Sequence, residues 1–463
     1  MHAAKLMQPP PDLYKPADNY AFRLIERHFA PLAPQKLLTT SRYFPDRLKA
    51  ELIAPLAELT AEVGSDGFTG LHFRGDSRGG FSSLLVEDDD PVLVAASHFE
   101  EVDLGLADSP DGRLRCLKNG LWLGGEGDAR FAAVYTYDTD THGDSALRLE
   151  VAVLPGEAGA RETRRIFARF DDALKQARMY RGRVLSFERS ELFGYAGIKV
   201  HALAKVTREQ IILAASTLEL IERNILRFTA QRPALAALGL PVKKGVLLYG
   251  PPGTGKTLTI QYIAAELKEA TTFLMTAEEV ANLPEYISLA RRIQPAVIVI
   301  EDIDLIAADR DDGYSFGGHS LLNRLLNEMD GLREDAEILF ILTTNRPEVL
   351  EPALAARPGR IDQAIEFPLP DEACRRRLVR WYSGRLPVAD ATVEEVTRRT
   401  KGVTASFIKE LMRRAAQFHL DEGGKGEVPV ALFVRSLEEM TVMGGKLTAK
   451  LLGAGTMGFG GGG

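Results

Sequence analysis

Residues 250–257 combine glycines, a lysine and a threonine in an order that suits the binding of phosphate groups. They read Gly-Pro-Pro-Gly-Thr-Gly-Lys-Thr and fit the pattern G-x-x-x-x-G-K-[ST]. The glycines let backbone N–H groups approach phosphate oxygens, and a following helix adds the positive end of its dipole. We expect Lys256 to reach the β- and γ-phosphates of a nucleotide and Thr257 to bind Mg²⁺. The residues expected to contact the nucleotide are Gly250, Pro251, Pro252, Gly253, Thr254, Gly255, Lys256, Thr257 and Leu258.

A short apolar run that ends in carboxylates follows about 45 residues after Lys256. Residues 296–300 read Ala-Val-Ile-Val-Ile, and Glu301, Asp302 and Asp304 come directly after them. This pattern predicts a buried strand that delivers acids to its carboxyl end, where ligands bind in parallel α/β sheets. One carboxylate is expected to hold Mg²⁺ through water and the next to polarise an attacking water.

A third segment, residues 343–371, places an asparagine and two arginines after another apolar strand. It contains Asn345, Arg357 and Arg360 and ends in Phe-Pro-Leu-Pro-Asp. A planar, permanently charged guanidinium suits a transition state in which charge spreads over phosphoryl oxygens.

Together the three segments resemble the AAA clade of the AAA+ ATPases, over about residues 200–440. The resemblance implies ATP and Mg²⁺ as cofactors and ATP hydrolysis as the activity. The family's acidic pair is Asp then Glu, whereas here Glu301 precedes Asp302. Glu301 would therefore face Mg²⁺ and Asp302 would orient the water. The Glu-Asp order of this pair is similar to that found in the mitochondrial Rieske-protein translocase branch of the family.

The same resemblance assigns roles to the third segment. Asn345 would sense the γ-phosphate, and Arg357 and Arg360 match arginine fingers that act on the neighbouring subunit's ATP. A ring of identical subunits follows, typically a hexamer. The stretch from Glu351 to Arg357 is one residue longer than the usual pattern, so which arginine reaches the phosphate stays open. Residues 401–408 resemble the family's adenine-contacting segment.

Strands alternating with helices between residues 196 and 371 indicate a parallel sheet. The predicted fold class is α/β: a P-loop parallel-sheet AAA+ module with a small all-α lid domain, preceded by an α+β N-terminal domain. The expected domains are 1–195 (client or partner binding), 196–371 (ATPase), 372–443 (helical lid) and 444–463 (flexible glycine-rich tail). In the first domain, helical spacing is expected over Asp18–Ala61, followed by strands that include Phe81–Val86, and then a helix with Ile166 and Phe170 on one stripe.

Composition and sequence patterns bear on the partners and the location of the protein. The net charge of −7 and pI near 5.8 disfavour a nucleic-acid partner. Two distant cysteines, Cys116 and Cys374, fit a reducing compartment. The chain shows no secretory signal and no apolar run long enough for a bilayer, so we expect a cytoplasmic protein without membrane partners. It has no H-E-x-x-H zinc site. The chain therefore does not look like the membrane-anchored AAA zinc proteases, despite similar motor motifs.

Residues 276–290 lack the Lys/Arg-aromatic-Gly pore signature of threading motors. We expect Tyr286 to pack inward and Tyr314 and Phe316 to be the candidates for axial contacts. The leading hypothesis is an ATP hydrolase that remodels or translocates a protein client, as a homo-oligomer. One alternative is an oligomeric switch or scaffold with weak hydrolysis, favoured by the Glu-Asp order. A second is a nucleic-acid-associated motor.

Overall fold

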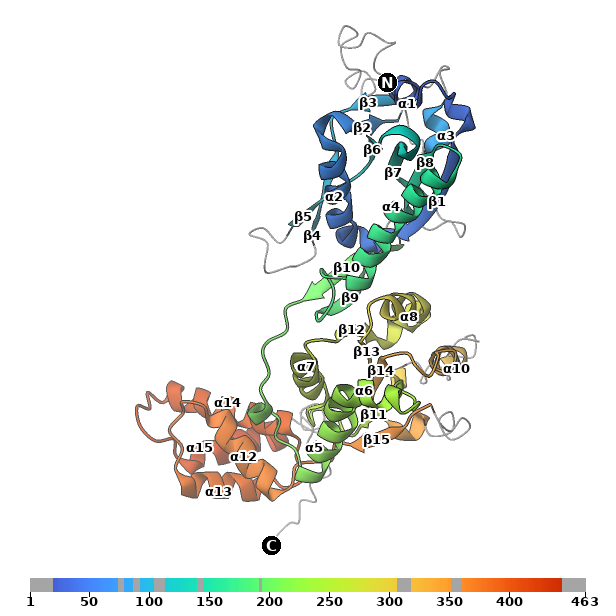
Figure 1. The fold of residues 1–463 in the computed structure, drawn as a ribbon. Coiled ribbons are helices and arrows are strands. Elements are labelled where there is room, and N and C mark those ends of the chain that lie inside the picture. The colour runs from blue at the N-terminus through green and yellow to red at the C-terminus, as the bar shows by residue number, and fades with distance from the viewer. Residues whose placement is uncertain are drawn as a thin grey trace. The chain divides into compact units, whose positions relative to one another are not determined.

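The computed structural model describes residues 20–73, 79–85, 92–103, 113–139, 145–190, 194–305, 318–350 and 360–443 (Figure 1). The chain divides into two compact units. One comprises Met1–Arg181 and Phe187–Ala202, and the other comprises Gly182–Ser186 and Leu203–Gly463. The expected boundary after residue 195 therefore falls inside strand β10 (Gly194–His201), which belongs to the first unit. The tail 444–463 lies outside the described residues.

The first unit is built on an antiparallel sheet with helices packed on it. The strand order is β1-β8-β7-β6-β2-β3. The strands are β1 (Leu38–Pro45), β2 (Phe68–His72), β3 (Leu93–Ala95), β6 (Gly120–Gly124), β7 (Phe131–Thr139) and β8 (Ser145–Val153). The helices are α1 (Ala21–Phe29), α2 (Lys49–Gly67), α3 (Phe81–Leu84) and α4 (Glu157–Gln176), and β4 (Phe99–Asp103) pairs with β5 (Arg113–Leu117) as a separate hairpin.

Successive apolar side chains of the central strands point to opposite faces, which explains why both faces of this sheet are covered. On β6, Leu121 joins the apolar cluster of α1, which contains Ile25 and Phe29. The next residue, Trp122, is fully buried and donates its indole N–H to Thr60 Oγ1 of α2 at 2.8 Å. Successive side chains of a strand point to opposite faces, so the sheet needs helices on both sides.

Two expectations for this unit need correction. The helical spacing over Asp18–Ala61 is present in α1 and α2, but it is interrupted by β1, which pairs with β8 over its full length. The expected strand Phe81–Val86 begins instead as the short helix α3, with Phe81 and Leu84 buried three residues apart. The Phe81 N–H donates to the buried Glu150 carboxylate of β8. In both cases a partner distant in sequence outweighs local propensity. The expected stripe on α4 is present, since Ile166 and Phe170 are buried.

The second unit contains a parallel sheet in the order β9-β12-β13-β14-β11-β15. Its strands are β9 (Val184–Ser190, of which Val184 and Leu185 pair with β12), β11 (Lys244–Tyr249), β12 (Thr271–Thr276), β13 (Ala296–Glu301), β14 (Ile338–Thr344) and β15 (Gln363–Glu366). Its helices are α5 (Ala215–Ile221), α6 (Phe228–Ala237), α7 (Lys256–Glu266), α8 (Leu283–Arg292) and α10 (Gly318–Asp330), with a π-helical turn (Glu222–Arg227) between α5 and α6.

The central strands β13 and β14 are buried on both faces, which explains their unbroken apolar sequences. One face packs against α5 and α7, where Val297 and Ile341 cluster with Ile221 and Ile260. Helix α8 packs on β12 and β13. Buried apolar strands that end at one edge place the polar residues that follow them along that edge.

Four helices after β15 form a small bundle, which is called the lid below. They are α12 (Glu372–Ser383), α13 (Asp390–Arg399), α14 (Ala405–Asp421) and α15 (Val430–Glu438), which ends in a π-helical turn (Glu439–Met443). Asp371 caps α12 by accepting from Cys374 N at 2.7 Å, and Thr404 caps α14 by accepting from Phe407 N at 3.2 Å. Phe407 and Leu411 lie in a core shared by the four helices. The helical pattern expected from residue 372 onward is present.

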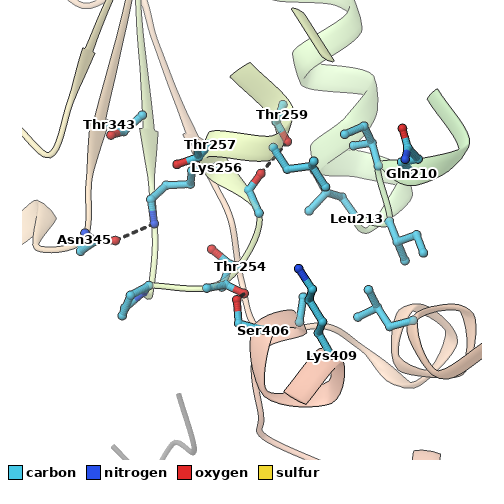
Figure 2. A pocket seen from close by; sticks show the side chains of 18 of the residues that line it. Gln210, Leu213, Thr254, Lys256, Thr257, Thr259, Thr343, Asn345, Ser406 and Lys409 are labelled. Atoms are coloured by element: carbon cyan, nitrogen blue, oxygen red, sulfur yellow. Dashed lines mark hydrogen bonds between the residues drawn. The ribbon is translucent and has the colours of Figure 1, made fainter. Parts of the chain in front are cut away.

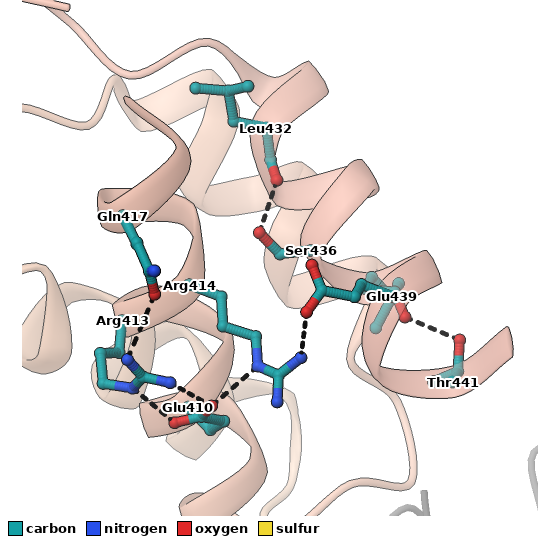
Figure 3. Close-up of polar contacts among 9 residues, drawn as sticks. Glu410, Arg413, Arg414, Gln417, Leu432, Ser436, Glu439 and Thr441 are labelled. Carbon is teal, nitrogen blue, oxygen red and sulfur yellow. Dashed lines mark hydrogen bonds and ion pairs between the residues drawn. The ribbon is translucent and has the colours of Figure 1, made fainter. Parts of the chain in front are cut away.

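An ion-pair network on the lid surface offers a test of pH-dependent stability (Figure 3). Glu410 accepts from Arg413 and Arg414 at 2.7 Å each, and Arg414 also binds Glu439 at 2.6 Å. The hydrogen bond from Arg413, followed by that from Arg414, lowers the pKa of Glu410 to about 2. A lowered pKa stabilises the fold above the unfolded-state value of about 4.3, and that stabilisation is lost as the pH falls toward the folded pKa.

We expect Glu410→Gln to lower the free energy of unfolding at pH 7 by at most about 1 kcal/mol, since solvent screens the pairs. The difference from wild type should shrink as the pH falls below about 4.3. Urea denaturation at pH 7, 5 and 4 measures it. Glu427→Gln is the control, because Glu427 is an exposed lid carboxylate with no ion pair among the described residues. A difference that stays constant over this pH range would contradict the prediction.

Candidate active site

The loop between β11 and α7 has a backbone that only glycine accommodates easily. Gly250, Gly253 and Gly255 have φ angles of 146°, 76° and 106°. A Cβ on Gly250 would collide with the carbonyl oxygen of Phe367, and one on Gly253 would lie 2.8 Å from Ser406 Oγ. A Cβ on Gly255 would meet nothing within 4 Å. The loop is therefore packed against β15 and the lid on one side and open on the other.

The open side faces a cavity of about 410 Å³, which lies between the parallel-sheet part and the lid (Figure 2). This volume is in the range of small-molecule sites. Besides the loop and the start of α7, the cavity is lined by Gln210, Ile211, Ile212, Leu213, Asp302, Thr343, Asn345, Leu378, Tyr382, Ala405, Ser406 and Lys409. The structure thus brings the phosphate loop together with Asp302 and Asn345 in one cavity.

Lys256 lies at the bottom of this cavity and is only 7% exposed. Its Nζ donates to Gly250 O at 2.7 Å and to Pro251 O at 3.1 Å. It also donates to Asn345 Oδ1 at 2.8 Å (Figure 2). Burial lowers the pKa of Lys256, while the nearby charges of Asp302 and Asp304 oppose that shift. The ammonium is held at the phosphate loop by weakly basic oxygens, and anionic phosphate oxygens would be stronger acceptors.

Thr257, at the start of α7, and Glu301, at the end of β13, bring two oxygen ligands together beside the phosphate loop. The Thr257 hydroxyl donates to Glu301 Oε1 at 2.8 Å. Hydroxyl and carboxylate oxygens are the ligands that Mg²⁺ uses in proteins, usually with waters and substrate phosphates completing its shell. The donor set present therefore fits Mg²⁺ bound together with a nucleotide.

Asp302 has an unusual backbone that favours its residue type. Its φ is +53°, in the left-handed region that aspartate and asparagine adopt more readily than other non-glycine residues. Its N–H donates to Thr343 Oγ1, and its Oδ1 accepts from Asn345 Nδ2, both at 2.9 Å. A glutamate would be less favourable at this φ, which gives a physical reason for the Glu-Asp order.

Sequence reasoning assigned no role to several residues that the structure places at or beside the site. Residues 210–213 come from the loop before α5, and Tyr382 and Lys409 come from the lid. Figure 2 shows the Lys409 side chain directed into the cavity. Asp304 Oδ1 accepts a hydrogen bond from Asn345 N at 3.1 Å. Only for Asp304 did the sequence carry a signal, because a third acid follows the strand two residues after Asp302.

Of the two arginines of the third segment, the structure describes only Arg360. Arg357 lies outside the described residues. Arg360 forms an ion pair with Asp330 of α10, contacts Asn327 Oδ1 at 3.4 Å and lines a separate cavity of about 250 Å³ together with Lys243. Arg360 is therefore not part of the nucleotide cavity of its own subunit.

Among the other expected positions, Tyr286 is fully buried against Phe273 of β12, as predicted. Tyr314 and Phe316 lie outside the described residues. In the segment 401–408, Ala405 and Ser406 line the cavity, whereas Phe407 and Ile408 are buried in the lid core. Ser406 N contacts Gly253 O at 3.2 Å, so the lid touches the phosphate loop directly.

Comparison with known proteins identifies the module that carries this site. Residues 246–369 match the model of the ATPase family associated with various cellular activities (AAA). These residues form an AAA module. The predicted resemblance to AAA ATPases and the α/β P-loop fold class are confirmed, and ATP with Mg²⁺ is the cofactor pair of such modules. The similarity to the Rieske-protein translocase branch stays a prediction.

The AAA module accounts for the similarity to curated relatives. The chain is 37% identical to an ATP-dependent zinc metalloprotease FtsH of Mycobacterium tuberculosis over 201 residues, which is 41% of this chain and 26% of the relative. It is 34% identical to the proteasome-activating nucleotidase of Methanocaldococcus jannaschii over 206 residues, which is 42% of this chain and 48% of the relative. The chain thus spans from about a quarter to about half of the length of these relatives.

Two further observations concern the described residues alone. No helix among them has the length and apolar character needed to cross a bilayer. No group of three or more His, Cys, Asp or Glu side chains among them is arranged to hold a metal ion.

Proposed function

We propose that this protein is a ring-forming ATPase that couples ATP hydrolysis to the remodelling or translocation of a protein client. One observation carries the proposal: Lys256, Asn345 and Asp302 form a hydrogen-bonded chain within one cavity, beside the Thr257–Glu301 pair. In this chain the amide of Asn345 contacts both a phosphate-binding lysine and a carboxylate that can act as a base. Phosphoryl transfer to water requires groups of these kinds close together.

The residues divide the work as follows. Lys256 and the loop N–H groups would bind the phosphates. Thr257 and Glu301 would hold Mg²⁺, which would supply positive charge next to the phosphate oxygens. Asp302 accepts a proton from the attacking water, and Asn345 orients that water. Asn345 contacts both Lys256 and Asp302, and so connects the phosphate-binding residue to the proposed base.

Arg360, with Arg357, is proposed to complete the site of the neighbouring subunit. Arg360 lines a cavity different from that of its own nucleotide site, which supports action across an interface. Its ion pair with Asp330 must then be exchanged for the neighbour's phosphate. A hexamer, residues 372–443 as the lid and residues 1–195 as the client domain belong to the same proposal. A cytoplasmic location is supported by the two buried, unbonded cysteines.

A switch or scaffold with weak hydrolysis is the second candidate. The bond from Asn345 Nδ2 to Asp302 Oδ1 favours it, since a carboxylate occupied by a neighbouring amide is less available to water. Stable ATP-bound oligomers without phosphate release would be its signature.

Phosphate release measured over a range of protein concentrations tests the ring. Turnover per subunit should rise with concentration for wild type. Arg360→Ala should lower it by roughly 10³-fold, because an arginine finger contributes that much or more, and should leave ATP binding intact. Arg333→Ala, which removes an exposed arginine just beyond α10, should have no effect.

Mixed rings give the decisive comparison. An Arg360→Ala subunit keeps its own loop, Glu301 and Asp302, and an Asp302→Asn subunit keeps its arginines. Mixing the two inactive variants should therefore restore part of the turnover. No recovery in mixed assemblies would show that Arg360 acts within its own subunit or not at all.

A further inference from the structure

Asp304 is a buried carboxylate that belongs to neither the nucleotide cavity nor an ion pair of the described residues. It follows β13 by three residues and is 7% exposed. It is not among the residues that line the cavity. A buried carboxylate needs acceptor contacts to offset its lost hydration, so its partners indicate what it does.

Both partners lie at the end of β14. Asp304 Oδ1 accepts from Thr344 Oγ1 at 2.9 Å and from Asn345 N at 3.1 Å. The last ladder pair between β13 and β14 joins Ile300 to Leu342, so the Asn345 N–H has no strand partner from β13. Asp304 supplies the acceptor that the strand no longer provides, since a backbone N–H left without a partner away from water is costly.

The contact with Asp304 fixes the backbone of Asn345, whose side chain lies between Lys256 and Asp302. With its backbone held by Asp304, Asn345 presents Oδ1 to Lys256 Nζ at 2.8 Å and Nδ2 to Asp302 Oδ1 at 2.9 Å. The two strand ends also hold each other, because Ile303 N donates to Thr343 O at 2.9 Å. A shift of the Asn345 peptide would therefore separate its amide from both partners.

We infer that Asp304 is a positioning residue, which sets the Asn345 amide between the phosphate-binding lysine and the water-orienting aspartate. The inference rests on the proposed ATPase function. Asp304 does not line the nucleotide cavity and, in this role, acts through Asn345.

The chemistry of the contact suggests a matched pair of variants. One oxygen, Oδ1, accepts both bonds, and an asparagine has such an oxygen, although a neutral acceptor is weaker than a carboxylate. Asp304→Asn should therefore keep the position of Asn345, and Asp304→Ala should lose it. Asp335→Ala, an exposed acid before β14, is the control.

We expect Asp304→Ala to lower kcat for ATP by roughly 10²-fold, the effect of a displacement of about 1 Å in an active site. The Kd for ATP, measured by equilibrium binding with Mg²⁺ present, should change by less than about 3-fold, which is under 1 kcal/mol. Asp304→Asn should restore kcat to within about tenfold of wild type, because its acceptor oxygen remains. Wild-type kcat in Asp304→Ala, or equal losses of binding and turnover, would overturn the inference.

A second measurement does not depend on turnover. Hydrogen exchange of the Asn345 amide should be faster in Asp304→Ala than in wild type and remain slow in Asp304→Asn. If wild type releases no phosphate, the proposed function fails, and the exchange of this amide still decides the role of Asp304. Unchanged exchange in Asp304→Ala would exclude the positioning role even in an active enzyme.

Discussion

Lys256→Met should weaken ATP binding by at least about 100-fold, since charge-assisted hydrogen bonds contribute about 1.5–3 kcal/mol each. The substitution keeps a side chain of similar length and removes the ammonium, which is 7% exposed and surrounded by the carbonyl oxygens of Gly250 and Pro251. No other described side chain from the loop or from α7 carries a positive charge into the cavity. Titration with a fluorescent ATP analogue measures the loss.

Two comparisons make this prediction specific. Lys268→Met changes an exposed lysine beyond the end of α7 and should leave the Kd unchanged. Because burial lowers the pKa of Lys256, the ammonium is lost at a lower pH than that of an ordinary lysine. ATP affinity should therefore decline in alkaline solution before the usual lysine pKa of about 10.4 is reached. Binding of normal strength by Lys256→Met would exclude this loop as the phosphate site.

Asp302→Asn should reduce phosphate release by about 10²–10⁴-fold, the contribution of a general base. ATP binding should be retained, because the new side chain can still accept the hydrogen bond from Asn345 Nδ2 that Asp302 Oδ1 accepts now. Single-turnover phosphate release together with an independent binding measurement separates the two effects. The variant should accumulate as an ATP-bound form.

Asp302→Glu asks whether the order of the acidic pair matters. The left-handed φ of +53° at this position is unfavourable for glutamate, by about 1–2 kcal/mol. We expect the variant to be less stable than wild type and no faster in hydrolysis. Normal turnover in Asp302→Asn would show that Asp302 is not the base and would direct attention to Glu301.

The sequence by itself determined the chemistry of the module. Phosphate binding requires glycines, a lysine and a hydroxyl in adjacent positions, so residues 250–257 were recognisable without any partner. Fully buried parallel strands are short apolar runs, which is why β13 was predicted to within a residue of its ends and an apolar strand was expected before Asn345. The acids and Asn345 follow those strands directly, and strand ends meet at one edge of a parallel sheet.

Tertiary structure decided what depends on segments far apart in the chain. Strand β1 exists because β8 pairs with it, and α3 is held by Glu150 of β8. The role of Asp304 and the partner of Arg360 are set by contacts across 41 and 30 residues of chain respectively. Local spacing carries no information about such contacts, because packing and hydrogen-bond geometry fix them only once the sheet, its helices and the lid have come together.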